Sequence, residues 1–171
     1  MSSSGTAAST ATFLPGGAPH VASPLDTAKY QADPCRTLTR AQLQSLGLPA
    51  ATPNPDIAFP AGPKCSWFST QTNSSIAMSF LTGNKRGLSN LYLKRKEAAL
   101  FQEIPPINGY PAVIFDEYAD QRSRGACSVA VGMSDTLILA VPVQGTPQTK
   151  DPCGIAQQAA GLIIENIKGG V

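Results

Sequence analysis

The sequence predicts an α+β domain in which an antiparallel sheet of about five strands packs against helices, in the order α-β-β-α-β-β-β-α. Three observations lead to this prediction. Short segments in which apolar and polar residues alternate are joined by turn residues, as in hairpins. Segments with helical apolar spacing stand at both ends of this series and in its middle. Four cysteines in a chain of 171 residues allow two disulfides.

The composition divides the chain into a tether and one domain. Residues 1–30 start with a long stretch of Ser, Thr, Ala, Gly and Pro that carries almost no charge, which predicts a flexible tether. Residues 31–171 can form a single core, since 42% of the chain is hydrophobic. The net charge of +2 does not indicate nucleic-acid binding, and no apolar run is long enough to span a membrane.

The first expected helix follows Asp33, whose carboxylate can cap free backbone N–H groups. Thr39 and Gln42 have the spacing of a capping box, in which each side chain bonds the backbone of the other. Gly47 suits the left-handed position that ends a helix. The proline-rich residues 49–63 predict a loop.

A hairpin and a second helix are expected next. Residues 64–70 and 75–82 alternate as strands do, and the polar residues between them predict a turn. Residues 88–104 have apolar positions on one side and basic residues on another, which favours a helix. The pair Pro105-Pro106 would end this helix.

The last third of the chain predicts three strands and a C-terminal helix. The strands are expected at 108–118, 126–133 and 136–143, and the short turn between the last two makes them the clearest hairpin. The final helix is expected to start at Asp151, with Pro152 in its first turn, where a backbone N–H is not needed.

The four cysteines are expected to form two structural disulfides. They lie too far apart in sequence for the usual zinc spacing or for a C-x-x-C redox motif, and a reactive thiol is the weaker alternative. Of the three possible connectivities we favour Cys35–Cys65 and Cys127–Cys153, because each would tie the start of a strand to the start of a helix. Such bridges form in exported proteins.

No catalytic group, cofactor or metal site emerges from the sequence. His20 is the only histidine and falls in the expected tether, so it is interpreted as a solvated linker residue. Asp116, Glu117 and Asp120 are clustered and could serve acid–base chemistry, but ion pairs in a solvated turn are the favoured interpretation. Trp67 is expected in the core beside a disulfide, with a stacking platform for a ligand as the alternative.

One concentration of basic residues could contact an anionic surface such as lipid headgroups or cell-wall phosphates. The alternative is a solvated helix face. The residues are Lys85, Arg86, Lys94, Arg95 and Lys96.

The order of several short motifs resembles a family of small actinobacterial lipoproteins known as a domain of unknown function. The motifs are DPCRTLT, LQSLG, CSW, INGYPAV, CSVAVGMSD and DPCGIAQQAAGLI. The cysteine order is more weakly similar to extracellular sensor domains of mycobacterial receptor kinases. The resemblance implies export and a lipid anchor at the outer face of the plasma membrane, with Met1 standing where the lipid-modified cysteine would be. It carries no established activity.

These observations together predict a non-catalytic binding or interaction module of the cell envelope. Its partner is expected to be an unknown envelope ligand or protein, and the domain is expected to be a monomer. A sensor or accessory subunit of an envelope transporter or kinase system is the first alternative. A cell-wall hydrolase that uses Asp116 and Glu117 is the second. An apolar cavity would favour ligand binding, whereas two carboxylates that converge in a cleft would favour hydrolysis.

Overall fold

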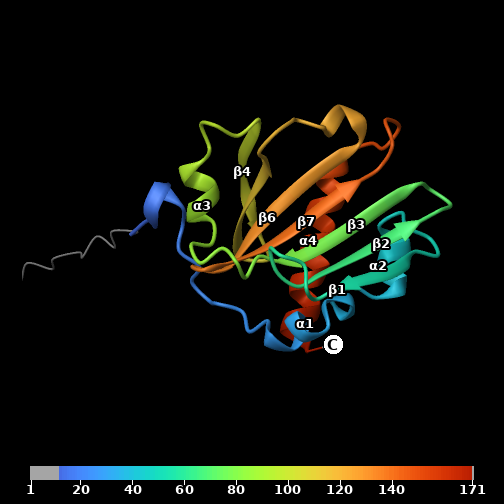
Figure 1. Ribbon diagram of the computed structural model, residues 1–171, viewed down its shortest axis with the longest axis horizontal. Helices are drawn as coiled ribbons and strands as arrows, with labels where there is room; N and C mark the ends of the chain where they lie inside the picture. Colours follow the sequence, from blue (N-terminus) through green and yellow to red (C-terminus); the bar gives the residue numbers. More distant parts are fainter. Residues whose placement is uncertain (1–11, 171) are drawn as a thin grey trace, which may run out of the picture.

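The computed structural model describes residues 12–170 (Figure 1). The helical elements are the 3-10 turns η1 Pro15–Gly17, η2 Pro34–Thr37 and η3 Arg122–Arg124, and the α-helices α1 Ala28–Ala32, α2 Arg40–Ser45, α3 Ser89–Leu93 and α4 Pro152–Gly169. The strands are β1 Thr52–Asp56, β2 Lys64–Ser69, β3 Ser74–Phe80, β4 Leu100–Ile107, β5 Tyr110–Asp116, β6 Ala126–Ser134 and β7 Leu137–Gln144. No helix in this part of the chain is both long enough and apolar enough to cross a bilayer.

All the described strands form one antiparallel sheet in the order β1-β2-β3-β7-β6-β5-β4. The predicted α+β class is confirmed, with seven strands in residues 12–170 where about five were expected. The last strand, β7, lies at the centre and joins the hairpin of β2 and β3 to the meander of β4, β5 and β6. Helix α4 runs along one face of this sheet, over β6 and β7 (Figure 1).

The two strands that the sequence did not predict are the two edges of the sheet. Residues 49–63 were expected to be a loop, but they contain β1, with prolines at 53 and 55. Residues 88–104 were expected to be one helix, but α3 ends at Leu93 and β4 begins at Leu100. Both edge strands contain prolines, whose missing N–H leaves no ladder bond unmade on the open side of an edge strand. Pro142 in the central strand β7 instead lies where the pairing with β3 is interrupted, between Ala140 and Val143. The prolines of residues 49–63 and the pair Pro105-Pro106, which led us to expect no strand there, are therefore compatible with edge strands.

The two tripeptides Asp-Pro-Cys fold differently. Asp151 caps α4 as predicted, and its carboxylate accepts a hydrogen bond of 2.9 Å from the N–H of Gly154. Asp33 makes no such side-chain bond, because only the short 3-10 turn η2 follows it. The predicted capping box of Thr39 and Gln42 is present one element later, at the start of α2.

Two disulfides have the pairing that was favoured from the sequence. Cys35 in η2 is bonded to Cys65 in β2, and Cys127 in β6 is bonded to Cys153 in the first turn of α4. The Cα atoms are 5.1 Å and 5.0 Å apart. Each bridge thus connects the sheet to a helical element that covers its α4 side.

The main core lies between the sheet and α4. The helix buries one apolar stripe, which includes Ala156, Ala160 and Ile163, against alternate residues of the strands. Trp67 is 2% exposed in this core, which also contains the buried Cys65 and Cys127. Trp67 is therefore a packing residue and offers no exposed face for stacking.

A buried amide holds the end of α4 against the N-terminal helices. Asn166 is 7% exposed, and its Nδ2 donates to the carbonyl of Thr37 at 2.9 Å and to Oε1 of Gln42 at 2.8 Å. Gln42 returns a hydrogen bond to Oδ1 of Asn166 at 3.1 Å. The hydroxyl of Tyr30 donates to the carbonyl of Asn166 at 3.0 Å. This network satisfies the buried amide and connects α1, η2 and α2 to α4.

A smaller apolar cluster lies on the opposite face of the sheet. Its buried members are Ala18, Leu88, Leu91, Tyr92, Val113, Ala130 and Ile138. They come from α3, from the strands and from the segment before α1, so α3 and this segment cover one end of the face (Figure 1). The edge-to-face contact of Tyr92 with Phe101, whose ring centroids are 5.0 Å apart, connects α3 to β4.

The segment before α1 differs from the expected tether. Residues 1–30 were predicted to be flexible, but from residue 12 onward the chain lies against the sheet, with Ala18, Val21 and Tyr30 buried. These isolated apolar residues in a Pro/Gly-rich stretch supply the contacts that the composition did not reveal. The part of the tether prediction that concerns residues 1–11 lies outside the described residues.

Candidate functional site

The face of the sheet opposite α4 carries a strap, which we define as residues 12–25. Ala18 is fully buried in the smaller apolar cluster, whereas Val21, 7% exposed, belongs to the main core, so the strap passes from this face to the α4 side. Leu14 is partly buried at the edge of the smaller cluster. The strap therefore adds apolar cover to a face that α3 alone leaves open.

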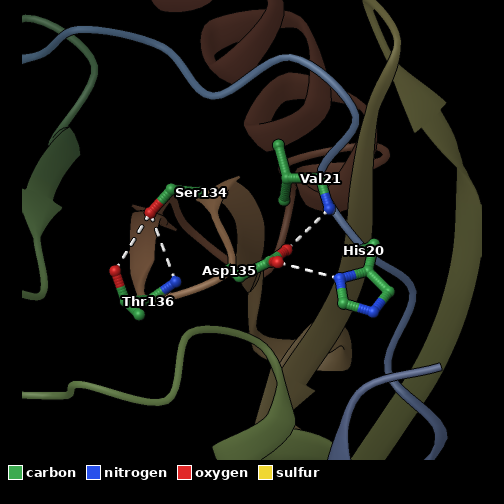
Figure 2. Close-up of polar contacts among 5 residues, drawn as sticks. All are labelled: His20, Val21, Ser134, Asp135 and Thr136. Carbon is green, nitrogen blue, oxygen red and sulfur yellow. Dashed lines mark hydrogen bonds and ion pairs between the residues drawn. The ribbon is translucent and has the colours of Figure 1, made fainter. Parts of the chain in front are cut away.

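Asp135 holds the strap through two hydrogen bonds (Figure 2). This residue lies in the turn between β6 and β7. Its Oδ1 accepts the backbone N–H of Val21 at 2.8 Å, and its Oδ2 is 2.8 Å from Nδ1 of His20. The bond from Val21 is the main reason why the pKa of Asp135 is lowered. His20 was interpreted as a solvated linker residue; its side chain is exposed, but it does not lie in a free tether, because this contact joins it to the turn of Asp135.

The neighbouring hydroxyl does not complete a catalytic triad. Ser134 Oγ accepts the N–H of Thr136 at 3.2 Å and lies 3.3 Å from the Thr136 hydroxyl. Figure 2 shows these contacts on the side of the turn away from His20. A Ser-His-Asp site requires the hydroxyl to meet the imidazole nitrogen that faces away from the carboxylate. In this arrangement the His20–Asp135 pair anchors a segment.

Further contacts anchor the strap along its length. Arg95 donates from Nη1 to the carbonyl of Gly16 at 2.7 Å. Gly16 has a φ of +78°, and a Cβ there would lie 3.0 Å from the backbone nitrogen of Leu93, so glycine is needed for this close approach. The Tyr110 hydroxyl donates to the carbonyl of Ser23 at 2.9 Å. The strap is thus bound at its start, middle and end.

A pocket of about 500 Å³, here called the α3 pocket, opens beside the start of α3. Leu81, Leu91 and Ala61 give it apolar walls, and Lys85 and Arg86 stand exposed at its rim. The remaining lining residues are Gly83, Asn84 and Asn90. Within residues 12–170 neither Lys85 nor Arg86 forms an ion pair. The pocket is therefore apolar inside and positively charged at its mouth.

A second hollow lies between the strap and the turn that holds Asp135. It has a volume of about 460 Å³, and its lining includes Leu14, Pro15, Ser89 and Asp135. Arg86 lines this hollow as well as the α3 pocket. Both oxygens of Asp135 already accept hydrogen bonds from the strap, so this carboxylate is committed to the fold.

The structure separates the five basic residues that were considered as one concentration. Lys85 and Arg86 precede α3 and line the α3 pocket. Lys94, Arg95 and Lys96 follow α3. Lys94 forms an exposed ion pair with Glu117 at 3.5 Å, and Arg95 is used to hold the strap. The first pair therefore borders a cavity, whereas two of the three residues after α3 bind other parts of the fold.

The carboxylates near the end of β5 have separate partners. Asp116 accepts the backbone N–H groups of Tyr118 and Ala119 at 3.0 Å and 3.1 Å. Glu117 pairs with Lys94, as described above. Asp120 forms a two-point contact with Arg122, at 2.9 Å and 2.6 Å, which lowers the pKa of Asp120 to about 2. This geometry fits a solvated turn, as the sequence suggested, and a carboxyl held this acidic is poorly suited to donate a proton.

Metal-ligating side chains do not gather in the described part of the chain. Among residues 12–170, no group of three or more His, Cys, Asp and Glu side chains is placed to hold an ion.

Sequence reasoning missed the strap and the role of Asp135. The stretch GMSDT indicated only a tight turn, because the partner of its aspartate lies more than a hundred residues earlier in the chain. Lys85 and Arg86 were identified as basic residues, but no sequence pattern indicated that Leu81 and Leu91 would form a cavity beside them.

The fold is a disulfide-linked α+β domain with a helix on one sheet face and a strapped, pocketed surface on the other. Over residues 1–166 the chain matches the family described as protein of unknown function (DUF3558). The chain therefore belongs to this family, in agreement with the resemblance to a domain of unknown function. No match was found among curated proteins or among solved structures. The two disulfides suggest an oxidising setting outside the cytosol.

Proposed function

We propose that the domain is a non-catalytic binding module of the cell envelope, held outside the cytosol by an N-terminal lipid. The observation that carries the proposal is the unequal cover of the sheet. One face is packed against α4, with a hollow of about 270 Å³ beside Ile155, while the other carries the larger α3 pocket and the hollow beside the strap. Concave sites with apolar walls and a few polar groups are the usual form of ligand sites.

The disulfides support a location where thiols are oxidised. Cys65, Cys127 and Cys153 are buried and Cys35 is half-buried, which suits structural bridges rather than catalytic or regulatory thiols. A domain held by two such bridges presents a rigid surface, and a rigid surface loses little entropy when it binds. The strap also fixes where any tether would leave the domain, which is the face that carries both cavities.

The location can be tested in the host bacterium with the natural precursor. We expect the protein in the membrane fraction of intact cells, accessible to external protease, with a mass increased by acyl chains. Substitution of the cysteine that would precede Ser2 should release the protein into the medium. A precursor that has no such cysteine, or protein that remains in the cytosol, would contradict the proposal.

The binding role can be tested by native mass spectrometry of protein purified from its own host. We expect a bound molecule or partner that is lost on denaturation. The same molecule should be absent from a control envelope protein of unrelated fold that is purified separately from the same host. Protein that carries nothing, together with turnover of a cell-wall substrate that depends on Asp116 and Glu117, would favour hydrolysis instead.

A further inference from the structure

We propose that the α3 pocket binds the anionic group, phosphate or carboxylate, of an amphiphile whose apolar part enters the pocket. The inference rests on the proposed binding function and names the class of ligand. It assigns Lys85 and Arg86 as the anion contacts and Leu81 and Leu91 as the apolar contacts.

Neither cation at the rim forms an ion pair with a described carboxylate. Asp135, which shares the second hollow with Arg86, is already bonded to His20 and Val21. Lys85 and Arg86 are exposed neighbours, and no carboxylate lines the pocket. The other described basic residues near α3 differ, because Lys94 is paired with Glu117 and Arg95 holds the carbonyl of Gly16. Two adjacent cations attract an anion, and a guanidinium matches phosphate or carboxylate through paired donors. Asn90, also in the lining, can donate a further hydrogen bond.

The walls select a ligand that is larger than a simple ion. A phosphate ion would occupy only a small part of a volume of about 500 Å³. Leu81, Leu91 and Ala61 would remain in contact with water around it. An apolar group attached to the anion would displace that water, which adds a hydrophobic contribution to the charge interaction.

The loop that carries the cations is already fixed without a ligand. Its first residue, Leu81, donates to the carbonyl of Ile138 at 2.9 Å. The Asn84 side chain accepts the N–H of Arg86 at 2.9 Å and donates to the carbonyl of Gly87 at 3.1 Å.

Gly87 allows the same loop to pack closely against the turn that contains Asp135. It has a φ of +51°, and a Cβ there would lie 2.5 Å from the Asp135 carbonyl oxygen. A loop held at both ends keeps the pocket open, so little ordering entropy is lost on binding.

The first experiment is a titration of the labelled protein followed by NMR. The probe is dihexanoyl phosphatidic acid below its micelle concentration, with dihexanoyl phosphatidylcholine and inorganic phosphate as comparisons. We expect shifts confined to residues around 81–91, and an affinity for phosphatidic acid about tenfold or more above that for inorganic phosphate. Equal affinities for the two anions, or shifts centred elsewhere, would overturn the proposal.

Variants separate a specific site from general charge attraction. Lys85→Gln with Arg86→Gln should weaken binding about tenfold or more, because hydrogen bonds to charged groups contribute about 1.5–3 kcal/mol each. The matched control, Arg124→Gln with Lys150→Gln, removes the same charges away from the pocket and should leave the affinity unchanged. An equal loss in both double variants would show non-specific attraction and refute the site.

Occlusion of the pocket provides a test that keeps both cations. Gly83 has an ordinary backbone conformation, and a Cβ there would lie 3.7 Å from its nearest neighbours, so Gly83→Leu can be accommodated without backbone strain. We expect this variant to retain its melting temperature and to lose the amphiphile while it still binds inorganic phosphate weakly. Unchanged amphiphile binding would contradict the assignment of the apolar walls.

Vesicles distinguish the two sources of such a ligand. Binding to vesicles of phosphatidylcholine with phosphatidic acid, lost in Lys85→Gln with Arg86→Gln, would identify a membrane headgroup as the source. Binding of monomeric dihexanoyl phosphatidic acid, without binding to vesicles, would identify a free amphiphile as the source. Absence of both would overturn the inference. A molecule that co-purifies from the host with this double variant would refute the α3 pocket as its site and leave the proposed binding function standing.

Discussion

The two disulfides should contribute almost equally to stability, because they close loops of similar length. The sequence separations are 30 residues for Cys35–Cys65 and 26 residues for Cys127–Cys153. Loop-closure entropy gives about 3.6 and about 3.5 kcal/mol at 25 °C for these lengths. We therefore expect the double alanine variants of each pair to lose about 3.5 kcal/mol in free energy of unfolding, with a small further loss of packing.

Urea unfolding followed by far-UV circular dichroism measures these losses. Wild type that has been mapped under non-reducing conditions serves as the reference, since four free thiols or another pairing would remove the basis of the prediction. A typical domain has a free energy of unfolding of about 5–15 kcal/mol, so both variants should remain folded enough for their stability to be measured. A loss below about 1 kcal/mol for either pair, or a difference above about 2 kcal/mol between the pairs, would refute the loop-entropy reasoning.

Three further predictions test other parts of the fold. Asn166→Ala should lower the free energy of unfolding by about 2–3 kcal/mol, because it leaves buried partners unsatisfied, and an effect near zero in urea unfolding would contradict the network. The lowered pKa of Asp135 means that its contribution is present above the ordinary aspartate value of 3.8 and is lost as the pH falls below it. The protection factor of the Val21 amide, which is its exchange rate corrected for the intrinsic pH dependence of exchange, should therefore fall at low pH in wild type. Asp135→Ala should show no such pH-dependent fall. Pro53→Thr with Pro55→Thr should expose a pairing-competent edge and produce dimers or larger species in analytical ultracentrifugation, whereas an unchanged monomer would show that these prolines do not protect the edge.

The sequence was most informative where local chemistry decides the structure. Hydrogen bonds within four residues explain why the Thr39–Gln42 capping box and the Asp151 cap were predictable. The central strands were predictable because larger and smaller apolar residues alternate along them. In β6, Val129 and Val131 face the main core, whereas Ala130 faces the smaller cluster on the other side of the sheet. The pairing of the cysteines followed from the same local setting, since each bridge joins a strand to the start of a helical element.

Edges and long-range contacts were not predictable in this way. The prolines of β1 and β4 contradict the usual propensity of a strand, and only the position at the edge makes them compatible with a sheet. The strap has a tether composition, yet Ala18 packs into the smaller apolar cluster and Val21 into the main core, whose other members lie far from the strap in sequence. For the same reason the sequence placed Lys85 and Arg86 in a basic stretch but could not assign a cavity to them.

The two bridges connect neighbouring cysteines along the chain and are not interleaved. A polypeptide that enters an oxidising compartment from its N-terminus therefore presents Cys65 after Cys35 and before Cys127. Cys127 and Cys153 enter last, when the first pair can already be closed. Delivery from the N-terminus therefore favours the native pairs over the two other connectivities.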